Sequence, residues 1–268
     1  MLPKYDWLHL LHEDFTGQYG RFYNGYHTQE WYIENQNRAE RLSKELGFSK
    51  VSQCKLAVAK KIKEYVAGGG FMFAMCSATD SYDIALAAEG LDICAVYYDG
   101  DGTDQNLNTK LDFSRTLAFK DFTLKDNPLE YEFSTIDNTY GREIAPDNDY
   151  FNLFEFSAKW DPIPTMLTQN HTKTIKGFMG QTTAFKKSLI KSDVLILGDT
   201  KAVDEVRYIH GAFNYGTWTF YAGHDPEDYQ HKVGDPPTDM NLHPNSPGYR
   251  LILNNVLFPA AKKKERKT

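Results

Sequence analysis

Residues 68–80 (GGGFMFAMCSATD) join a helix, a strand and a second helix in close succession, and this constrains the fold more than any other segment. Upstream, apolar residues recur at helical spacing from Leu56 to Val66. The three glycines then end that helix, because glycine tolerates the backbone conformation of a helix carboxyl end. Residues 71–75 form a short apolar run typical of a buried strand, and a helical pattern resumes at residues 82–88. This alternation predicts an α/β fold.

Cys76 stands on the turn between this strand and the following helix. Ala74 and Ala78 flank it at two residues on either side, and Ser77 follows it directly. A nucleophile elbow needs small residues at these positions, because the tight turn brings neighbouring backbone close. Free cysteine is also among the most buried residue types, so a structural thiol is the alternative interpretation. The turn therefore predicts a candidate nucleophile at Cys76.

Two other expected strands also end in polar clusters. The strand at residues 218–222 (WTFYA) precedes GHDPEDYQH at 223–231, and the strand at residues 5–11 (YDWLHLL) precedes an acidic cluster. In open α/β sheets, ligands bind in the crevice beyond the carboxyl ends of the strands. The residues that we expect to converge there are His12, Glu13, Asp14, Cys76 and His224.

These residue types together support nucleophilic catalysis. A neutral imidazole at His224 would take the proton of the Cys76 thiol, and Asp225 or Glu227 would hold the ring and stabilise its cation. The backbone amide of Ser77 would help to bind an oxyanion. We assign His12, Glu13 and Asp14 to substrate binding, because no HExxH or comparable spacing favours a metal site. No cofactor is expected.

Composition excludes some classes of partner. The chain has 268 residues, is 41% hydrophobic and carries 30 basic against 36 acidic residues, which gives a net charge of -6. This charge disfavours nucleic acid and anionic membranes as partners. No apolar run approaches the length of a membrane span, and three widely spaced cysteines indicate reduced thiols. We therefore expect a cytoplasmic protein that acts on a small molecule.

The chain is expected to form a single domain, residues 1–268. Residues 92–161 change character and are interpreted as a β-rich insertion, with strand-like stretches at 113–124 and 150–156. From residue 193 onward the pattern is rich in strands, and residues 259–268 form a basic tail. The other expected helices are residues 28–46, 51–67 and 249–258.

The segments EYVAGGGFMFAMC at 64–76 and GTWTFYAGHDPED at 216–228 resemble the class I glutamine amidotransferase-like superfamily, and within it the trehalose-utilisation-like domains. The resemblance implies a flavodoxin-like open sheet and a hydrolase acting on an amide or related carbonyl. It also implies a strand-helix unit before residues 5–11, which this chain does not contain. An amino-terminal partner domain or a second copy of the chain would then complete the fold.

Nearly the whole chain also resembles the carboxyl-terminal part of a bacterial family commonly labelled asparagine synthetase B. The shared motifs are HEDFTGQYG at 12–20, FAMCSATD at 73–80, GHDPEDYQH at 223–231 and HPNSPGYRLILNNVLFPA at 243–260. The chain has no amino-terminal nucleophilic cysteine and no SGGxDS-type loop, so synthetase chemistry is not predicted. The alternative function is a non-catalytic ligand-binding or interaction domain of the same fold, including a carbohydrate-directed one.

Overall fold

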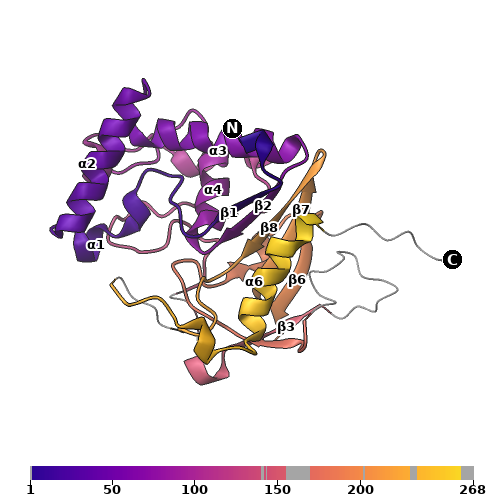
Figure 1. The fold of residues 1–268 in the computed structure, drawn as a ribbon. Helices are drawn as coiled ribbons and strands as arrows, with labels where there is room; N and C mark the ends of the chain where they lie inside the picture. Colours follow the sequence, from indigo (N-terminus) through magenta and orange to yellow (C-terminus); the bar gives the residue numbers. More distant parts are fainter. Residues whose placement is uncertain are drawn as a thin grey trace.

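The structure is a computed structural model that describes residues 2–139, 142, 144–154, 170–201, 203–229 and 234–260. A mixed sheet forms the centre of the molecule, with strand order β1-β2-β8-β7-β6-β3-β4 and β5 paired with β7 (Figure 1). The strands are β1 Trp7–Leu10, β2 Phe71–Met75, β3 Tyr150–Leu153, β4 Thr174–Lys176, β5 Phe185–Lys186, β6 Leu195–Thr200, β7 Glu205–Phe213 and β8 Gly216–Tyr221. β1, β2 and β8 are parallel to one another, and the remaining pairings are antiparallel.

Helices cover both faces of this sheet. The helices are α1 Tyr23–Tyr26, α2 Glu30–Glu45, α3 Val51–Ala67, α4 Ser77–Ala87, α5 Val96–Asp99 and α6 Pro247–Leu257. Single-turn 3-10 helices lie at Leu2–Lys4, Tyr19–Arg21, Leu107–Thr109, Phe113–Arg115, Pro146–Asn148, Lys187–Leu189, Met240–Leu242 and Phe258–Ala260. Figure 1 shows α3 and α4 on one side of the sheet, α2 outside them, and α6 on the other side.

Strand β2 separates two hydrophobic clusters, because successive side chains of a strand point to opposite faces. Met72 and Ala74 pack into the cluster beneath α3 and α4, whereas Phe73 and Met75 pack into the cluster that contains Leu251 of α6. Every residue of β2 is buried. The sequence pattern of a fully buried strand is thus confirmed.

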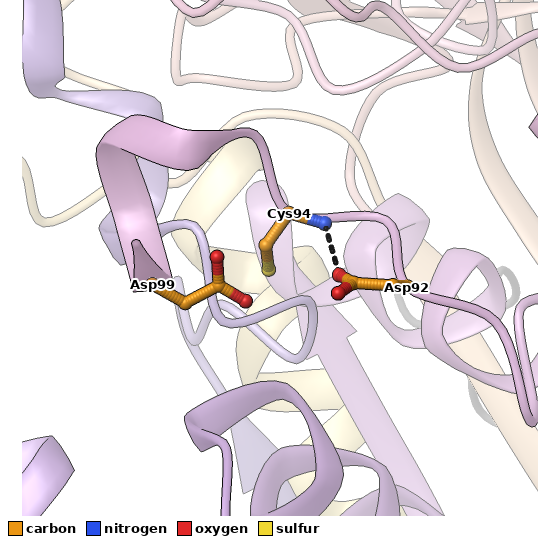
Figure 2. A group of neighbouring side chains, drawn as sticks. All are labelled: Asp92, Cys94 and Asp99. Atoms are coloured by element: carbon orange, nitrogen blue, oxygen red, sulfur yellow. Dashed lines mark hydrogen bonds between the residues drawn. The ribbon is translucent and has the colours of Figure 1, made fainter. Parts of the chain in front are cut away.

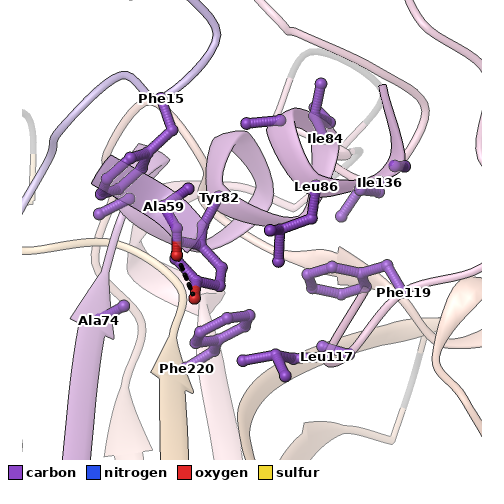
Figure 3. Packing of buried hydrophobic residues seen from close by; sticks show 14 of the residues in the cluster. Phe15, Ala59, Ala74, Tyr82, Ile84, Leu86, Leu117, Phe119, Ile136 and Phe220 are labelled. Atoms are coloured by element: carbon purple, nitrogen blue, oxygen red, sulfur yellow. Dashed lines mark hydrogen bonds between the residues drawn. The ribbon is translucent and has the colours of Figure 1, made fainter. Parts of the chain in front are cut away.

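The larger cluster fixes the position of α4 against α3 (Figure 3). Tyr82 of α4 is fully buried, and its hydroxyl donates a hydrogen bond of 3.1 Å to the carbonyl of Ala59 in α3. Its ring contacts Phe15 and Phe220 edge to face. Because α4 begins at Ser77, this packing also fixes the residue directly before it, Cys76.

The mixed α/β class predicted from the sequence is confirmed, as are most of the expected elements around the sheet. The expected helix at 28–46 begins two residues later as α2, and the helix expected from residue 82 begins at Ser77 instead. Within the described residues, no helix is long and apolar enough to span a membrane. The end of the chain that was expected to be a basic tail lies outside the described residues from 261 onward.

The expectation of strands at 113–124 is wrong. This stretch contains a 3-10 helix and isolated bridges at Phe119 and Leu124. Its apolar residues from Leu117 to Leu124 are nevertheless buried. The carboxylate of Asp83 accepts hydrogen bonds from the backbone amides of 117–119, so these amides are satisfied without strand pairing. In the stretch expected at 150–156, β3 covers 150–153, and residues 155 and 156 lie outside the described residues.

Candidate functional site

Cys76 occupies a strained turn between β2 and α4. Its backbone has φ 53° and ψ −138°, a positive-φ conformation that residues with a side chain rarely adopt. The amide of Cys76 donates to the carbonyl of Tyr221 at the end of β8 (3.0 Å), and its carbonyl accepts from the amide and hydroxyl of Thr79. These bonds on both sides hold the strained residue in place, as an elbow requires.

The sulfur of Cys76 is enclosed and surrounded by backbone amides. The residue is 1% exposed, and the amide of Gln181 donates a hydrogen bond of 3.1 Å to the sulfur. Burial raises the pKa of the Cys76 thiol to about 11, although amides of Thr182, Ser77 and Gln181 favour the thiolate and partly oppose this rise. The thiol is therefore neutral near pH 7 in this conformation.

Residues 178–183 (FMGQTT), here called the 178–183 segment, lie over the sulfur. A Cβ atom added at Gly180 would be 2.8 Å from the sulfur of Cys76 and 3.0 Å from Cδ2 of His224. A methyl group at Gly180 would therefore crowd both side chains. The sulfur of Cys76 and the ring of His224 thus both lie beside Gly180, and their joint role in catalysis stays a prediction.

The parallel register explains why these residues meet. Cys76 follows β2, His224 follows β8 by three residues, and His12 follows β1, so all three lie at the carboxyl ends of parallel neighbours. The rings of His12 and His224 have centroids 6.5 Å apart. Gly223 adopts φ 81° and donates its amide to the carbonyl of Thr182 (2.8 Å), which joins the turn after β8 to the 178–183 segment.

The acids expected to orient His224 bond to other residues. The carboxylate of Asp225 accepts hydrogen bonds from Tyr249 (2.7 Å), Thr238 (2.6 Å) and the amides of Glu227 and Asp228. Burial opposes ionisation of Asp225, but these hydrogen bonds outweigh burial and lower its pKa. Glu227 lies 3.5 Å from Nδ1 of His243. The orienting role of either acid stays a prediction, and the last residues of the GHDPEDYQH motif, 230 and 231, lie outside the described residues.

The residues assigned to substrate binding divide into exposed and buried groups. His12 and Glu13 are exposed beside the site. Asp14 is buried, and its carboxylate accepts hydrogen bonds from Thr16 and from the amide of Gly20, so it organises its own loop. The hydroxyl of Ser77 is buried and has no hydrogen-bond partner among the described residues. Of these residues, His12 is exposed and has its ring beside that of His224, and the substrate-binding roles stay predictions.

Sequence reasoning did not identify two buried carboxyl groups, Asp80 and Asp137, that contact the 178–183 segment. Asp80 accepts hydrogen bonds from the hydroxyl of Thr182 (2.9 Å) and the amide of Ser81 (2.9 Å). Asp137 accepts from the amide of Thr183 (3.3 Å) and from Thr139. The sequence placed Asp80 among the capping residues of α4, and nothing in a single sequence indicates its pairing with a loop about 100 residues away.

Burial changes the protonation of both acids. It raises the pKa of Asp80 to about 7, and it raises the pKa of Asp137 well above its usual range, with the charge of Asp80 adding to the rise. Each carboxyl group keeps one buried oxygen, Oδ2, without a hydrogen-bond partner among the described residues. The 178–183 segment is thus held through two acids that are costly to ionise.

A buried ion-pair network anchors the ends of the same segment. The guanidinium of Arg207 in β7 donates to the carbonyls of Phe178 (3.2 Å) and Thr183 (2.5 Å) and to both carboxylate oxygens of Asp149 (2.6 Å). Arg142 also pairs with Asp149, and it bridges to Glu205. Both ends of the segment are therefore fixed to the sheet.

A second acidic cluster lies on another part of the molecule (Figure 2). Ligand atoms of Asp92, Cys94 and Asp99 lie within 4.8 Å of one another. The ammonium group of Lys50 already bonds to Asp92, Asp99 and Asp101. Because this cation neutralises the carboxylates that a metal ion would need, the cluster does not favour a metal site.

A cavity of about 340 Å³ adjoins this cluster and not the candidate site. Apolar side chains such as Phe15, Leu56 and Ile93 line it, with Lys50 and Asp104 among its polar residues. Neither Cys76 nor His224 contributes to its wall. The cavity therefore gives no support to the chemistry expected at the elbow.

Comparisons with known proteins leave the family open. No protein-family model matches the chain, and no curated protein matches it. Among solved structures, a protein described as "Cytoplasmic Protein STM3548 from Salmonella typhimurium" matches 96% of this chain and 72% of its own length, with 12% identity and a TM-score of 0.42. A likeness at this level carries no argument about fold or function.

Proposed function

We propose that this chain is an amidotransferase-like hydrolase domain in which Cys76 attacks the carbonyl carbon of an amide or a related acyl group. The carrying observation is the positive-φ backbone of Cys76, held between β2 and α4, with His224 beside the same glycine, Gly180, that packs against the sulfur. A residue other than glycine persists in such a conformation only where its surroundings impose it, and such strain is concentrated at active sites. A cysteine on a strand-to-helix turn matches the geometry of a nucleophile elbow.

The proposed reaction needs no group beyond this chain and water. The thiol proton of Cys76 passes to His224 as the carbon–sulfur bond forms, and the amide of Ser77 donates to the developing oxyanion. The carbon–nitrogen bond then breaks, and His224 returns the proton to the leaving nitrogen. Water, deprotonated by His224, hydrolyses the thioester and restores the thiol.

The fold proposed for this function is the flavodoxin-like sheet of the class I glutamine amidotransferase-like superfamily, in its trehalose-utilisation-like branch. It is supported by the motifs around Cys76 and His224 and by the parallel strands β1, β2 and β8 that precede them. We further propose a small-molecule substrate, a cytoplasmic location, and completion of the sheet beside β1 by an amino-terminal partner domain or a second copy. Asp225 and Glu227 remain the proposed alternatives for the acid that orients His224.

Covalent labelling by a substrate analogue tests the proposal. The probe is 6-diazo-5-oxo-L-norleucine, a glutamine analogue that alkylates nucleophilic cysteines, with p-nitrophenyl acetate as a general acyl substrate. We expect a single adduct on Cys76 by peptide mass spectrometry, and ester hydrolysis that Cys76→Ala abolishes and His224→Ala lowers at least about tenfold. Cys54→Ala is the matched control, because Cys54 is a buried thiol in α3. Hydrolysis that survives Cys76→Ala, or no adduct with either probe, would contradict the proposal.

A non-catalytic binding or interaction domain is the second candidate. The enclosed sulfur of Cys76 and its raised pKa favour it, because a neutral thiol without access to solvent is a poor nucleophile. This candidate predicts that Cys76→Ala leaves ligand binding unchanged. Thermal unfolding in the presence of L-glutamine or trehalose separates the ligand classes, since a ligand that binds only the folded state raises the midpoint.

A further inference from the structure

Exposure varies along the 178–183 segment, which packs against the candidate nucleophile. Residues 181–183 are buried, whereas Met179 and Gly180 are partly exposed. A Cβ added at Gly180 would lie 2.8 Å from the sulfur, so this partly exposed residue packs against Cys76.

The contacts of the 178–183 segment differ between its ends and its middle. The ends are held by the charged, fully buried side chain of Arg207. The middle is held by neutral donors: the Thr182 hydroxyl donates to Asp80, the Gln181 side chain donates to the carbonyl of Gly20, and the amide of Gly223 donates to the carbonyl of Thr182. If the middle of the segment moved away, the hydrogen bonds from these neutral donors would break. The bonds from the charged Arg207 side chain to the ends of the segment would remain.

The two acids also make the closed arrangement costly. Oδ2 of Asp80 and Oδ2 of Asp137 are buried and accept no hydrogen bond from the described residues. A buried polar atom without a partner gives up its interaction with water and gains nothing in exchange. The groups that hold the segment over the sulfur would thus be better solvated if the segment moved away.

From these contacts we infer that the 178–183 segment is a gate over Cys76, with Thr182 and Asp80 as its latch, and that an acyl substrate reaches the sulfur only when the latch opens. The inference rests on the proposed function, since it concerns access to the same nucleophile. On this inference, Cys76 is enclosed because opening and closing of the segment controls access to the site. It also gives Gln181 and Thr182 a positioning role, because their amides contact the sulfur when the gate is shut.

The test measures access to Cys76 without requiring catalysis. Thr182→Val removes the hydroxyl that bonds to Asp80 and keeps the shape of the side chain. N-ethylmaleimide labelling is followed by peptide mass spectrometry, with Cys54 and Cys94 as internal references. We expect Thr182→Val to speed labelling of Cys76 at least about tenfold and to leave the two references unchanged.

Two matched variants control this result. Thr182→Ser retains the hydroxyl and is expected to label Cys76 at the slow wild-type rate. Thr200→Val makes the same change in β6, at a buried hydroxyl with no hydrogen-bond partner among the described residues, and is also expected to leave the rate unchanged. Equal labelling of Cys76 in Thr182→Val and Thr200→Val would overturn the gate, as would fast labelling in the wild-type protein.

Amide hydrogen exchange provides a measurement on the unmodified chain. Peptides that cover residues 179–183 are expected to exchange at least about tenfold faster than those of β2 and β8, because the gate opens without global unfolding. Exchange as slow as that of β2 and β8 would overturn the gate. Failure of the proposed function gives a different result. If Thr182→Val exposes Cys76 but the cysteine reacts with neither the glutamine analogue nor p-nitrophenyl acetate, the gate stands and the hydrolase is excluded.

Discussion

At Cys76, a backbone that favours glycine carries a buried side chain. Its positive φ costs on the order of 1–3 kcal/mol. Stability alone would select glycine or a relaxed turn at this position. The proposed function would account for this strain, because it requires a thiol at this point of the turn.

Substitutions at Cys76 can separate strain from packing. Cys76→Gly relieves the positive-φ conformation, whereas Cys76→Ala removes the sulfur and keeps the strain. We expect the glycine variant to be more stable than the alanine variant by about 1 kcal/mol in urea unfolding, the reverse of the usual preference for alanine.

The matched control for this comparison is Ala78→Gly in the buried, regular part of α4. There, glycine should lower stability by about 1 kcal/mol, because the residue has ordinary helical geometry. A Cys76→Gly variant that is less stable than Cys76→Ala by a similar amount would show that the turn stores no strain.

The raised pKa of Asp80 predicts a pH dependence of stability. Its pKa is about 7 when folded against 3.8 for the free group, so the folded state holds the proton more tightly than the unfolded state. This contribution to stability is complete below pH 3.8 and is lost as the pH rises through 7. Asp80→Asn does not titrate and keeps an oxygen for Thr182, so its stability relative to wild type should improve between pH 5 and pH 8 by on the order of 2 kcal/mol.

Chemical denaturation at the two pH values measures this difference. Asp112→Asn is the control, because the pKa of exposed Asp112 is lowered to about 2 by Ser114 and Arg115 and does not change ionisation between pH 5 and pH 8. The same relative stability of Asp80→Asn at both pH values would mean that Asp80 is already ionised in the folded protein at pH 5.

At the scale of elements, the sequence predicted what local periodicity determines. The bounds of α3 and β2 are confirmed, because apolar spacing and glycines mark their ends. The 178–183 segment has no periodicity, and its bond to Cys76 spans 105 residues, so it was not predicted. Likewise, the aromatic residues around Phe119 predicted strands, but the carboxylate of Asp83 in α4 accepts the backbone hydrogen bond there in place of a neighbouring strand. Contacts of this kind depend on tertiary structure and leave no local pattern.

In the candidate site, too, local sequence predicted some features, while contacts that depend on tertiary structure were not predicted. The sequence predicted the turn at Cys76 and its proximity to His224, because both follow parallel strands. Its assignment of Asp14 to substrate binding stays a prediction, and the structure shows in addition that this carboxylate bonds to its own loop. A carboxylate that follows a strand can face a crevice or fold back onto nearby amides, and residue type alone does not distinguish these outcomes.

On the scale of the whole molecule, one buried ion-pair network connects parts of the chain that are distant in sequence. Asp149 precedes β3, Arg207 lies in β7, and Tyr229 donates to Asp149 from the loop that follows β8 (3.0 Å). Through Arg207 the network also reaches the 178–183 segment. The antiparallel half of the sheet is thereby coupled to the site at the end of its parallel half.

Asp149→Asn should therefore destabilise the whole fold. Burial opposes ionisation of Asp149, but the hydrogen bonds and charges of Arg142 and Arg207 outweigh it and lower its pKa to about 2. Removal of this charge leaves two buried guanidinium groups with less compensation, a change that typically costs 3–5 kcal/mol, so we expect a loss on the order of 3 kcal/mol in urea unfolding. Lys61→Met, which breaks an exposed pair with Glu64, should change stability by less than about 0.5 kcal/mol. A loss as small as that of Lys61→Met would show that the network does not hold the two halves of the sheet together.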